Sequence, residues 1–258
     1  MAKTMRILIT GGASGIGLGT AERMIAGGHH VIVLDRQNPP ASCKAEYIEA
    51  DLSNTGSTAK ALDKALSGGA LDGLVNNVAT TRPALLEDVK YDDIDAVMAL
   101  NIRCPIQCAQ AVLPGMRKKK FGRIVNISSR ASLGKHLRTT YAASKAGVHG
   151  MTRVWALELA QDGITVNTVA PGPIDTPLFR QVNTMDNPRT RSMIASIPVQ
   201  RMGQPADIAN AVAFFLDPAS SFVTGQLIFV DGGMSVALAG ADGYMPEVEK
   251  VLRSAAAS

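Results

Sequence analysis

Seven short runs rich in Val, Ile and Leu are spread along the chain, and longer segments with helical spacing lie between them. Each run is continuously apolar, a pattern that is typical of strands in a parallel sheet covered on both faces. The predicted strands are Arg6–Thr10, Val31–Asp35, Tyr47–Ala50, Leu71–Val75, Arg123–Ser128, Thr165–Val169 and Leu227–Val230. The predicted helices are Gly15–Ala26, Asn54–Leu66, Tyr91–Met116, Tyr141–Ala160 and Ala206–Leu216. This alternation predicts an α/β fold, a doubly wound seven-stranded parallel sheet with helices on both faces.

One stretch interrupts the alternation. From Pro171 to Pro205 the chain carries six prolines and little strand character. A segment of this length inside a compact domain is usually a lid or a binding loop, so residues 173–204 are predicted to cover a substrate. Residues 234–258 form a tail that ends in a charged helical pattern, Pro246–Arg253. No repeat or linker divides the chain, which predicts a single domain over residues 1–258.

Composition favours a soluble globular protein. Hydrophobic residues make up 46% of the 258 residues and charged residues 19%. A net charge of +4 and 4% aromatic residues give no indication of nucleic acid binding. Only Ile7–Ile9 is apolar near the N-terminus, and no run approaches the ~18 residues of a membrane span, so no signal peptide or membrane contact is expected. Three cysteines and four histidines lack metal-ligand spacing, which predicts no metal and a reduced, cytoplasmic protein.

A glycine-rich turn joins the first predicted strand to the first predicted helix. The segment Thr10–Gly17 has the sequence TGGASGIG. Glycines permit a tight turn and a close approach of the backbone, and the N–H groups of a helix N-terminus bind a pyrophosphate. The turn therefore predicts a dinucleotide site, and a purely structural turn is the alternative. The candidate cofactor-binding residues are Gly11, Ser14, Gly15, Ile16 and Gly17.

Acidic residues follow the second and third predicted strands. Asp35 ends the second strand, where a carboxylate accepts hydrogen bonds from an adenosine ribose and repels a 2′-phosphate. Arg36 follows it and could in principle hold that phosphate. We expect NAD in preference to NADP; a surface carboxylate without this role is the alternative. Asp51 and Leu52 follow the third strand, where the base of a dinucleotide lies in such a sheet.

Tyr141 and Lys145 are four residues apart on a predicted helix, and so lie on one face. A phenol has a pKa of about 10 and transfers protons poorly at neutral pH. An ammonium about 4 Å away, at an effective dielectric constant of about 20, favours phenolate by ~4 kcal/mol and predicts a phenol pKa of about 7. Ser129 lies twelve residues before the tyrosine, at a strand end. With the glycine turn, these residues predict acid–base catalysis beside a dinucleotide.

The chain resembles the short-chain dehydrogenase/reductase family over almost its whole length, in the branch typified by 3-oxoacyl-[acyl-carrier-protein] reductases. The family's glycine motif matches Thr10–Gly17, and its Asn-Asn-Ala-Gly motif is matched in part by Asn76–Ala79. Its Pro-Gly motif matches Pro171–Gly172, and its last strand and exit match Gly225–Gly233. The resemblance implies a single-domain Rossmann fold. It identifies the active-site residues as Asn101, Ser129, Tyr141 and Lys145.

The resemblance implies a role for each active-site residue. Ser129 orients the substrate carbonyl or hydroxyl, and Tyr141 transfers the proton. Lys145 binds the nicotinamide ribose and lowers the pKa of the tyrosine. Asn101 holds a water that connects the lysine to solvent.

The resemblance also implies further cofactor contacts. The backbone of Ile174 and the hydroxyl of Thr176 hold the carboxamide, and the loop beyond them closes over the substrate. The other implied contacts are Asn77, Tyr141, Lys145, Pro171 and Gly172.

Two departures from the family pattern bear on function. Val78–Ala79 replace the expected Ala-Gly, and Ala79 restricts a backbone position that glycine leaves free, so a small local shift is expected. Asp35 fits poorly with a biosynthetic reductase built for NADPH and favours an NAD-dependent alcohol dehydrogenase.

Basic residues gather near the predicted site. An anionic substrate or an acidic carrier protein at the mouth of the site is one interpretation, and solvated surface charge is the favoured one. These residues are Arg130, Lys135, His136 and Arg138 before the tyrosine, and Arg180, Arg189 and Arg191 in the predicted lid. The family resemblance further implies that the helix from Asn101 and the helix of Tyr141 pair between subunits, which suggests a homotetramer.

Together these observations predict an NAD(H)-dependent oxidoreductase that interconverts a secondary alcohol and a ketone, with Tyr141 as general acid/base. Its partner is a small-molecule alcohol or ketone rather than nucleic acid or a membrane. A 3-oxoacyl-thioester reductase is the alternative among enzymes. A dinucleotide-sensing binding protein is the alternative outside enzymes, and the presence of all four active-site residues speaks against it.

Overall fold

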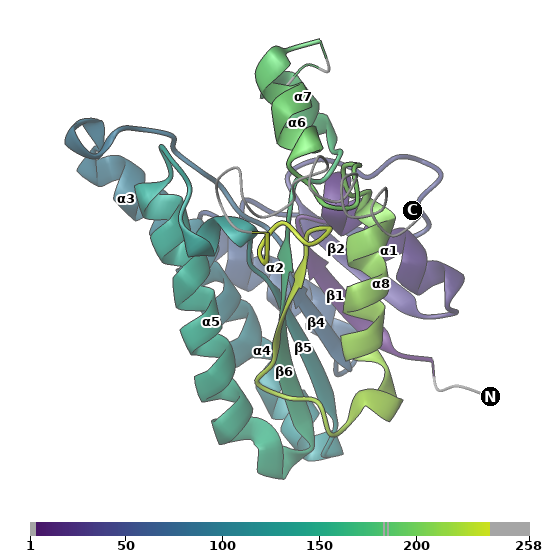
Figure 1. The fold of residues 1–258 in the computed structure, drawn as a ribbon. Helices are drawn as coiled ribbons and strands as arrows, with labels where there is room; N and C mark the ends of the chain where they lie inside the picture. The colour runs from purple at the N-terminus through teal and green to yellow at the C-terminus, as the bar shows by residue number, and fades with distance from the viewer. Residues whose placement is uncertain (1–3, 183, 185, 238–258) are drawn as a thin grey trace, which may run out of the picture.

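Seven parallel strands form one sheet in the order β3-β2-β1-β4-β5-β6-β7 (Figure 1). This computed structural model describes residues 4–182, 184 and 186–237. The seven predicted strands are all present, with ends that differ by at most two residues, and every residue of β4, β5 and β6 is buried. The strands are β1 (Arg6–Thr10), β2 (His30–Asp35), β3 (Glu46–Glu49), β4 (Gly73–Asn76), β5 (Gly122–Ile127), β6 (Ile164–Pro171) and β7 (Leu227–Val230).

Helices cover both faces of the sheet, because successive side chains of each strand point to opposite faces. Leu8 and Ile32 belong to the core beneath α2 (Thr55–Ser67), α4 (Cys104–Lys119) and α5 (Thr139–Leu159). Ile7 and Ile9 belong to the core beneath α1 (Gly15–Ala26) and α8 (Pro205–Leu216), which lie side by side (Figure 1). The predicted doubly wound fold is confirmed.

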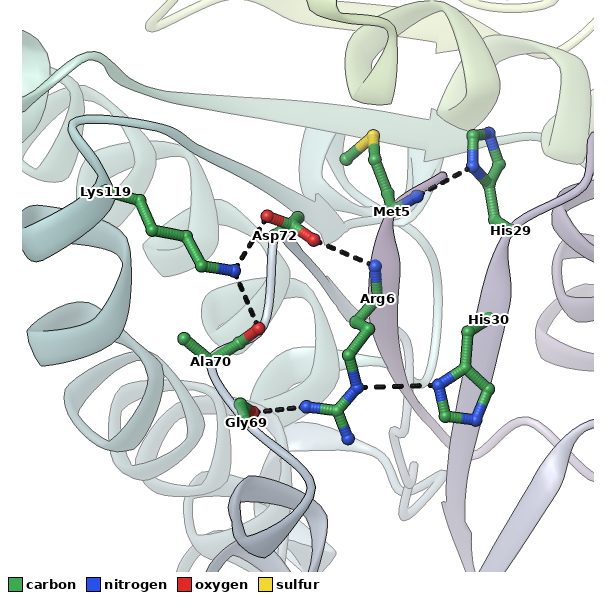
Figure 2. A network of polar contacts seen from close by, with 8 residues as sticks. All are labelled: Met5, Arg6, His29, His30, Gly69, Ala70, Asp72 and Lys119. Atoms are coloured by element: carbon green, nitrogen blue, oxygen red, sulfur yellow. Dashed lines mark hydrogen bonds and ion pairs between the residues drawn. The ribbon is translucent and has the colours of Figure 1, made fainter. Parts of the chain in front are cut away.

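A network of polar contacts links the amino ends of β1, β2 and β4 (Figure 2). This edge of the sheet is opposite the glycine-rich turn. The buried carboxylate of Asp72 accepts the backbone N–H of Arg6 at 3.0 Å and the ammonium of Lys119 at 2.9 Å. The Arg6 guanidinium donates to the carbonyl of Gly69 and, at 3.4 Å, to Nδ1 of His30. This network joins β1, β2, the start of β4 and the end of α4, so it stabilises the fold at an edge remote from the site.

The predicted helix Tyr91–Met116 is continuous but not regular. α3 (Tyr91–Met98) passes through a π-helical turn (Ala99–Arg103) into α4, which ends at Lys119. Within the part of the chain that the structure describes, Tyr91–Lys119 is the one helix long and apolar enough to meet the criteria for a membrane span. A buried core helix meets the same criteria, and Cys104, Cys108 and Val112 of α4 are fully buried against the sheet. The sequence-based exclusion, which considered unbroken apolar runs, overlooked this helix.

The proline-rich segment extends beyond the carboxyl edge of the sheet (Figure 1). It contains two short helices that the sequence did not predict, α6 (Pro177–Val182) and α7 (Pro188–Ala195). Its base is closed by a parallel bridge between Ile174 and Gly203. The predicted tail helix Pro246–Arg253 lies outside the described residues.

Candidate active site

The candidate site lies at the carboxyl ends of β1 and β4, where the order of the strands reverses. Loops that leave such neighbouring strands diverge and form a crevice for a ligand. Asn77, after β4, ties the two loops together: its Nδ2 donates to the carbonyls of Thr10 at 3.0 Å and Gly11 at 2.9 Å. The Thr10 hydroxyl accepts the N–H of Asn77 at 3.0 Å. The side chain of Asn77 therefore positions the glycine turn, and its direct contact with a cofactor stays a prediction.

The glycine turn has a backbone that requires glycine. Gly11 and Gly15 have φ angles of +67° and +53°, which other residues rarely adopt. A Cβ atom on Gly17 would lie 2.1 Å from the carbonyl oxygen of Gly11, so glycine there lets α1 pack against the turn. Ser14 precedes α1 without a side-chain cap, and no acidic residue lies in the first turn, so the N–H groups of Gly15, Ile16 and Gly17, which precede the first helical hydrogen bond from Leu18 to Ser14, are open to an anion. This cradle fits the pyrophosphate of a dinucleotide.

Asp35 stands directly beside this turn. Its carboxylate accepts the backbone N–H groups of Ala13 at 3.0 Å and Gln37 at 3.1 Å. The Asp35 side chain is half-buried and Arg36 is exposed. A fixed carboxylate at this place fits a ribose hydroxyl pair and opposes a phosphate on the ribose.

Asp51 and Leu52 differ in what they offer to a cofactor. Asp51 is exposed, and hydrogen bonds from the hydroxyl and N–H of Ser53, at 2.6 and 3.0 Å, lower its pKa, as does the charge of Arg36. Leu52 is 3% exposed and packs into the core under α2. Any contact of Leu52 with a base therefore comes from its backbone.

The Pro171–Gly172 motif shapes the carboxyl end of β6. The N–H of Gly172 donates to the carbonyl of Val230 at 3.0 Å. A Cβ atom on Gly172 would lie 2.6 Å from the Cβ of Asp231, so glycine is required by the close approach of the chain after β6 to the end of β7. The motif positions the segment that follows it.

Ile174 and Thr176 lie in that segment. The neighbours of Ile174 bond Gly203, through the carbonyl of Pro173 at 3.0 Å and the N–H of Asp175 at 2.8 Å. In an extended chain, the N–H and C=O of Ile174 then face the opposite side, free for a ligand. A Cβ atom on Gly15 would lie 3.2 Å from Cγ2 of Thr176, so this segment lies against the glycine turn.

Ser129 and Tyr141 are brought together by the loop between β5 and α5. The Ser129 hydroxyl accepts the N–H of Ala131 at 3.1 Å, at the start of a 3-10 turn (Arg130–Leu133). A hydrogen bond to Ser129 also lowers the pKa of the Tyr141 phenol. The two side chains therefore lie near each other, and their joint role in catalysis stays a prediction.

The predicted acidity of Tyr141 is wrong, because the pKa of its phenol is raised. Burial raises the pKa of Tyr141, and the hydrogen bond to Ser129 and the charge of Arg138 offset this only in part. The Lys145 ammonium lies 5.8 Å from the centre of the tyrosine ring. It donates to the carbonyl of Ile127 at 2.7 Å, so its charge is directed at the end of β5. The spacing along the helix correctly placed Tyr141 and Lys145 on one face of α5. It could not show that the Ile127 carbonyl competes with the phenol for the Lys145 ammonium.

Lys145 is 3% exposed, and burial lowers its pKa to about 8. The ammonium form therefore still predominates at neutral pH. Ser128, next to the candidate serine, donates its hydroxyl to the carbonyl of Lys145 at 2.8 Å and lies 2.7 Å from Nε2 of His149. Sequence reasoning missed Ser128 and His149 as supports of the lysine.

Asn101 is 1% exposed and lies in the π-helical turn. Its amide accepts the N–H of Thr80 at 2.8 Å and donates to the Thr80 carbonyl at 3.0 Å and the Ser144 hydroxyl at 2.9 Å. Ser144 in turn donates to the carbonyl of Tyr141 at 2.8 Å. The side chain of Asn101 is therefore occupied in holding the loop after β4 to α5, and a water relay there would have to use its main chain.

The substitution at Ala79 is accommodated without strain. Ala79 is exposed, and its φ angle is not positive. An alanine can adopt this backbone, which agrees with the expected small effect. Val78, beside it, packs against the core under α2 and α4.

Comparison with known proteins agrees with this geometry. The family model described as enoyl-(acyl carrier protein) reductase matches residues 11–235. The chain belongs to the short-chain dehydrogenase/reductase family. This confirms the resemblance drawn from the motifs.

Three relatives in this family illustrate its range. A (2S)-[(R)-hydroxy(phenyl)methyl]succinyl-CoA dehydrogenase subunit of Thauera aromatica is 38% identical over 89% of this chain and 96% of its own. The ligand-free aldohexose dehydrogenase of Thermoplasma acidophilum is 31% identical, with a TM-score of 0.86 over 95% of this chain and 98% of its own. A 3-oxoacyl (acyl-carrier-protein) reductase of Agrobacterium tumefaciens with NADP bound is 30% identical, with a TM-score of 0.82 over 88% of this chain and 93% of its own.

Family membership makes this protein an oxidoreductase of the class that uses a nicotinamide dinucleotide, and the cradle at Gly11–Gly17 and Asp35 fits such a group. The described residues contain no group of three or more histidine, cysteine or acidic side chains placed to hold a metal ion.

Proposed function

We propose that this short-chain dehydrogenase/reductase interconverts a secondary alcohol and a ketone with NAD(H). The observation that carries the proposal is the placement of Ser129 and the buried, cationic Lys145 near the Tyr141 phenol, at the same carboxyl edge of the sheet as a glycine turn that fits a dinucleotide. A bound nicotinamide supplies or accepts the hydride. The chain's own groups then have to orient the oxygen atom of the substrate and move one proton.

Each residue has a distinct task in this proposal. The Ser129 hydroxyl holds the substrate oxygen, and Tyr141, whose raised pKa keeps the phenol protonated, donates its proton to a ketone oxygen in the reducing direction. The Lys145 ammonium binds ribose hydroxyls and stabilises the phenolate that remains after the transfer. Ile174 offers its backbone and Thr176 its hydroxyl to the carboxamide, with α6 and α7 as the lid.

Replacing Tyr141 by phenylalanine tests the proposal. We expect turnover to fall about a thousand-fold, since the proton donor is lost, and the dissociation constant of the dinucleotide to change little. Tyr91→Phe is the matched control, because Tyr91 is 85% exposed on α3. Steady-state rates followed at the nicotinamide absorbance band check both variants. Undiminished turnover in Tyr141→Phe would exclude the proposed proton transfer.

The choice of NAD over NADP rests on Asp35. Its carboxylate is held by two backbone N–H groups, so it cannot turn away from a ribose phosphate without losing them. The Agrobacterium tumefaciens relative has the same fold and binds NADP. The fold alone therefore does not select NAD, and the preference has to come from residues such as Asp35. We expect wild-type kcat/KM to favour NADH at least ten-fold and Asp35→Ala to lose most of that preference. A wild-type preference for NADPH would show that Asp35 does not select the cofactor.

A second candidate is reduction of a 3-oxoacyl thioester. It is favoured by the names of two relatives, one acting on a CoA thioester and one on an acyl-carrier-protein substrate. Comparing 3-oxobutanoyl-CoA with simple ketones as substrates separates the two candidates. A homotetramer and a cytoplasmic location remain predictions that accompany both.

A further inference from the structure

We propose that three cations between Ser129 and Tyr141, namely Arg130, Lys135 and Arg138, bind a carboxylate of the substrate. We name these three residues the 130–138 cluster. The inference rests on the proposed function, because it assigns a substrate class, an oxo acid or hydroxy acid, to the same active site.

The local charge balance is one-sided. Residues 96–157 contain eleven lysine and arginine residues and no aspartate or glutamate. The candidate catalytic residues Asn101, Ser129, Tyr141 and Lys145 all fall within this stretch. A surface whose cations serve only solubility normally mixes both signs of charge. The cations at 117–120 and Arg123 lie at the opposite, amino edge of the sheet, where Asp72 and Asp162 pair with three of them. The cations between Ser129 and Tyr141 have no acidic residue in their own segment.

The 130–138 cluster lacks the partners that neighbouring cations have. Arg82 pairs with Asp93 at 3.3 Å, and Arg180 of the predicted lid pairs with Asp175 at 2.6 Å. Within the described ranges, no carboxylate lies within ion-pair distance of the cluster. The lid cation Arg180 is thus paired with an acidic residue, whereas the three cations of the 130–138 cluster are not.

The three cations act on one another and on the catalytic phenol. Partial burial lowers the pKa of Lys135, and so do the charges of Arg138 and Arg130. The charge of Arg138 also lowers the pKa of Tyr141. The positive charge of the cluster therefore acts on the proton donor Tyr141. A bound carboxylate would reduce the electrostatic repulsion among Arg130, Lys135 and Arg138.

The loop is held firmly enough to present these side chains. The N–H of Ala84 donates to the carbonyl of Leu137 at 3.2 Å, and the N–H of Arg138 donates to the carbonyl of Lys135 at 3.2 Å. Leu137 has a φ angle of +63°, a left-handed conformation that a leucine keeps only when its surroundings enforce it. A preorganised loop loses little entropy when it binds an anion.

The N-terminus of α5 adds a second attraction for an anion. Arg138 is its N-cap residue and makes no side-chain cap, and the first turn has no acidic residue. The N–H groups of that turn therefore lack a side-chain acceptor, and the helix dipole favours negative charge there. Thr140, in the same turn, is 8% exposed, and its hydroxyl has no hydrogen-bond partner.

The test compares acids with amides of the same shape. The probes are 2-, 3- and 4-oxopentanoate and the three corresponding oxopentanamides. Each is titrated by calorimetry into the full chain saturated with NAD⁺ or NADP⁺, whichever binds, because the oxidised cofactor cannot reduce them. We expect at least one acid to bind about ten-fold more tightly than its amide, and this ratio to fall with added salt.

Two double variants with equal loss of charge make the comparison specific. In Arg130→Gln/Lys135→Gln, the ratio of acid to amide affinity should fall to within about three-fold. The control Lys60→Gln/Lys118→Gln removes two exposed cations of α2 and α4 and should keep the wild-type ratio. Arg138→Gln, tested alone, should lower the ratio and also raise the pKa seen in the pH profile of the reduction.

Several outcomes would overturn the inference. They are equal binding of acids and amides by the wild type, failure of every acid to bind, or the same loss in the control variant. Salt-sensitive binding of 3-oxobutanoyl-CoA without binding of the acids would assign the cluster to CoA phosphates and also overturn it. If the wild type reduced the amides and Tyr141→Phe did not, the proposed function would stand although the carboxylate site was refuted.

Discussion

Lys145 carries an isolated positive charge into the interior beside the carbonyl of Ile127. One hydrogen bond to a carbonyl does not replace the hydration of an ammonium, so burial lowers its pKa from 10.5 to about 8. The folded protein thus binds this proton less tightly than the unfolded chain does. An active site retains such a residue for its chemistry, at the expense of stability.

The stability of the protein should therefore depend on pH through this lysine. Below pH 8 both states hold the proton; between about pH 8 and 10.5 only the unfolded chain does, so stability rises with pH. Relative to Lys145→Met, the free energy of unfolding of the wild type should rise by about 2.5 kcal/mol from pH 7 to pH 10, given the pKa of about 8. Urea unfolding of both proteins at the two pH values measures this difference. A constant difference would mean that Lys145 is solvated in the folded state.

The glycine turn shows how far single residues could be assigned from the sequence. Its dinucleotide-binding shape was predictable, because glycine content and position before a helix are local features. The reason for Gly17 is not local. It allows the helix to approach the carbonyl of Gly11, a contact that depends on how α1 turns back onto the loop.

At the scale of elements, the continuous helix Tyr91–Lys119 is shaped by Asn101. A π-helical turn inserts an extra residue and marks functional sites in many helices. Here it places the Asn101 amide between Thr80 and Ser144, which joins the loop after β4 to α5. The apolar periodicity predicted the helix but not the π-helical turn. An extra residue in one turn changes the backbone hydrogen bonds, and the amino-acid composition of the segment does not reveal it.

Replacing Asn101 by alanine separates a positioning role from a relay role. Because the amide satisfies the backbone N–H and C=O of Thr80, its loss should destabilise the protein by about 2–3 kcal/mol. Ser144→Ala, which removes one hydrogen bond of the same network, should cost about 1 kcal/mol. Denaturant titrations measure both values. If Asn101→Ala kept full stability and lost only turnover, the amide would act in proton transfer rather than in support.

At the scale of the whole molecule, large apolar side chains remain exposed on the outer helices. Val154 and Leu157 of α5 are 50% and 82% exposed, and Phe214 of α8 is 52% exposed. Phe222, shortly before β7, is fully exposed. Exposed apolar side chains on one helix face are a common feature of contacts with another protein chain, and Val154 and Leu157 lie on α5, whereas Phe214 lies on α8 at the other face of the sheet. The exposed Val154 and Leu157 on α5 favour the predicted pairing of subunits through α4 and α5.

We therefore expect a tetramer of about 108 kDa, four times the chain mass of 27.1 kDa. Leu157→Glu should lower the mass of the assembly, because a carboxylate would be buried in the contact without a partner. Leu86→Glu, at an exposed leucine of the 3-10 turn before α3, is the matched control. Light scattering after size-exclusion chromatography measures the masses. A wild-type mass of one chain would refute the expected assembly.

The sequence was enough to predict the strands, most helices and the glycine turn, since periodicity and motif spacing are properties of neighbouring residues. It did not predict the helices α6 and α7, the π-helical turn or the direction in which the Lys145 ammonium points. These features depend on contacts between segments that are distant in the sequence, which compete for the same hydrogen-bond donor or fill the same volume. Packing decided that Lys145 donates to Ile127, and that burial raises the pKa of Tyr141. A phenol's acidity depends on its desolvation and on the position of every nearby charge, which become known only when the chain is folded.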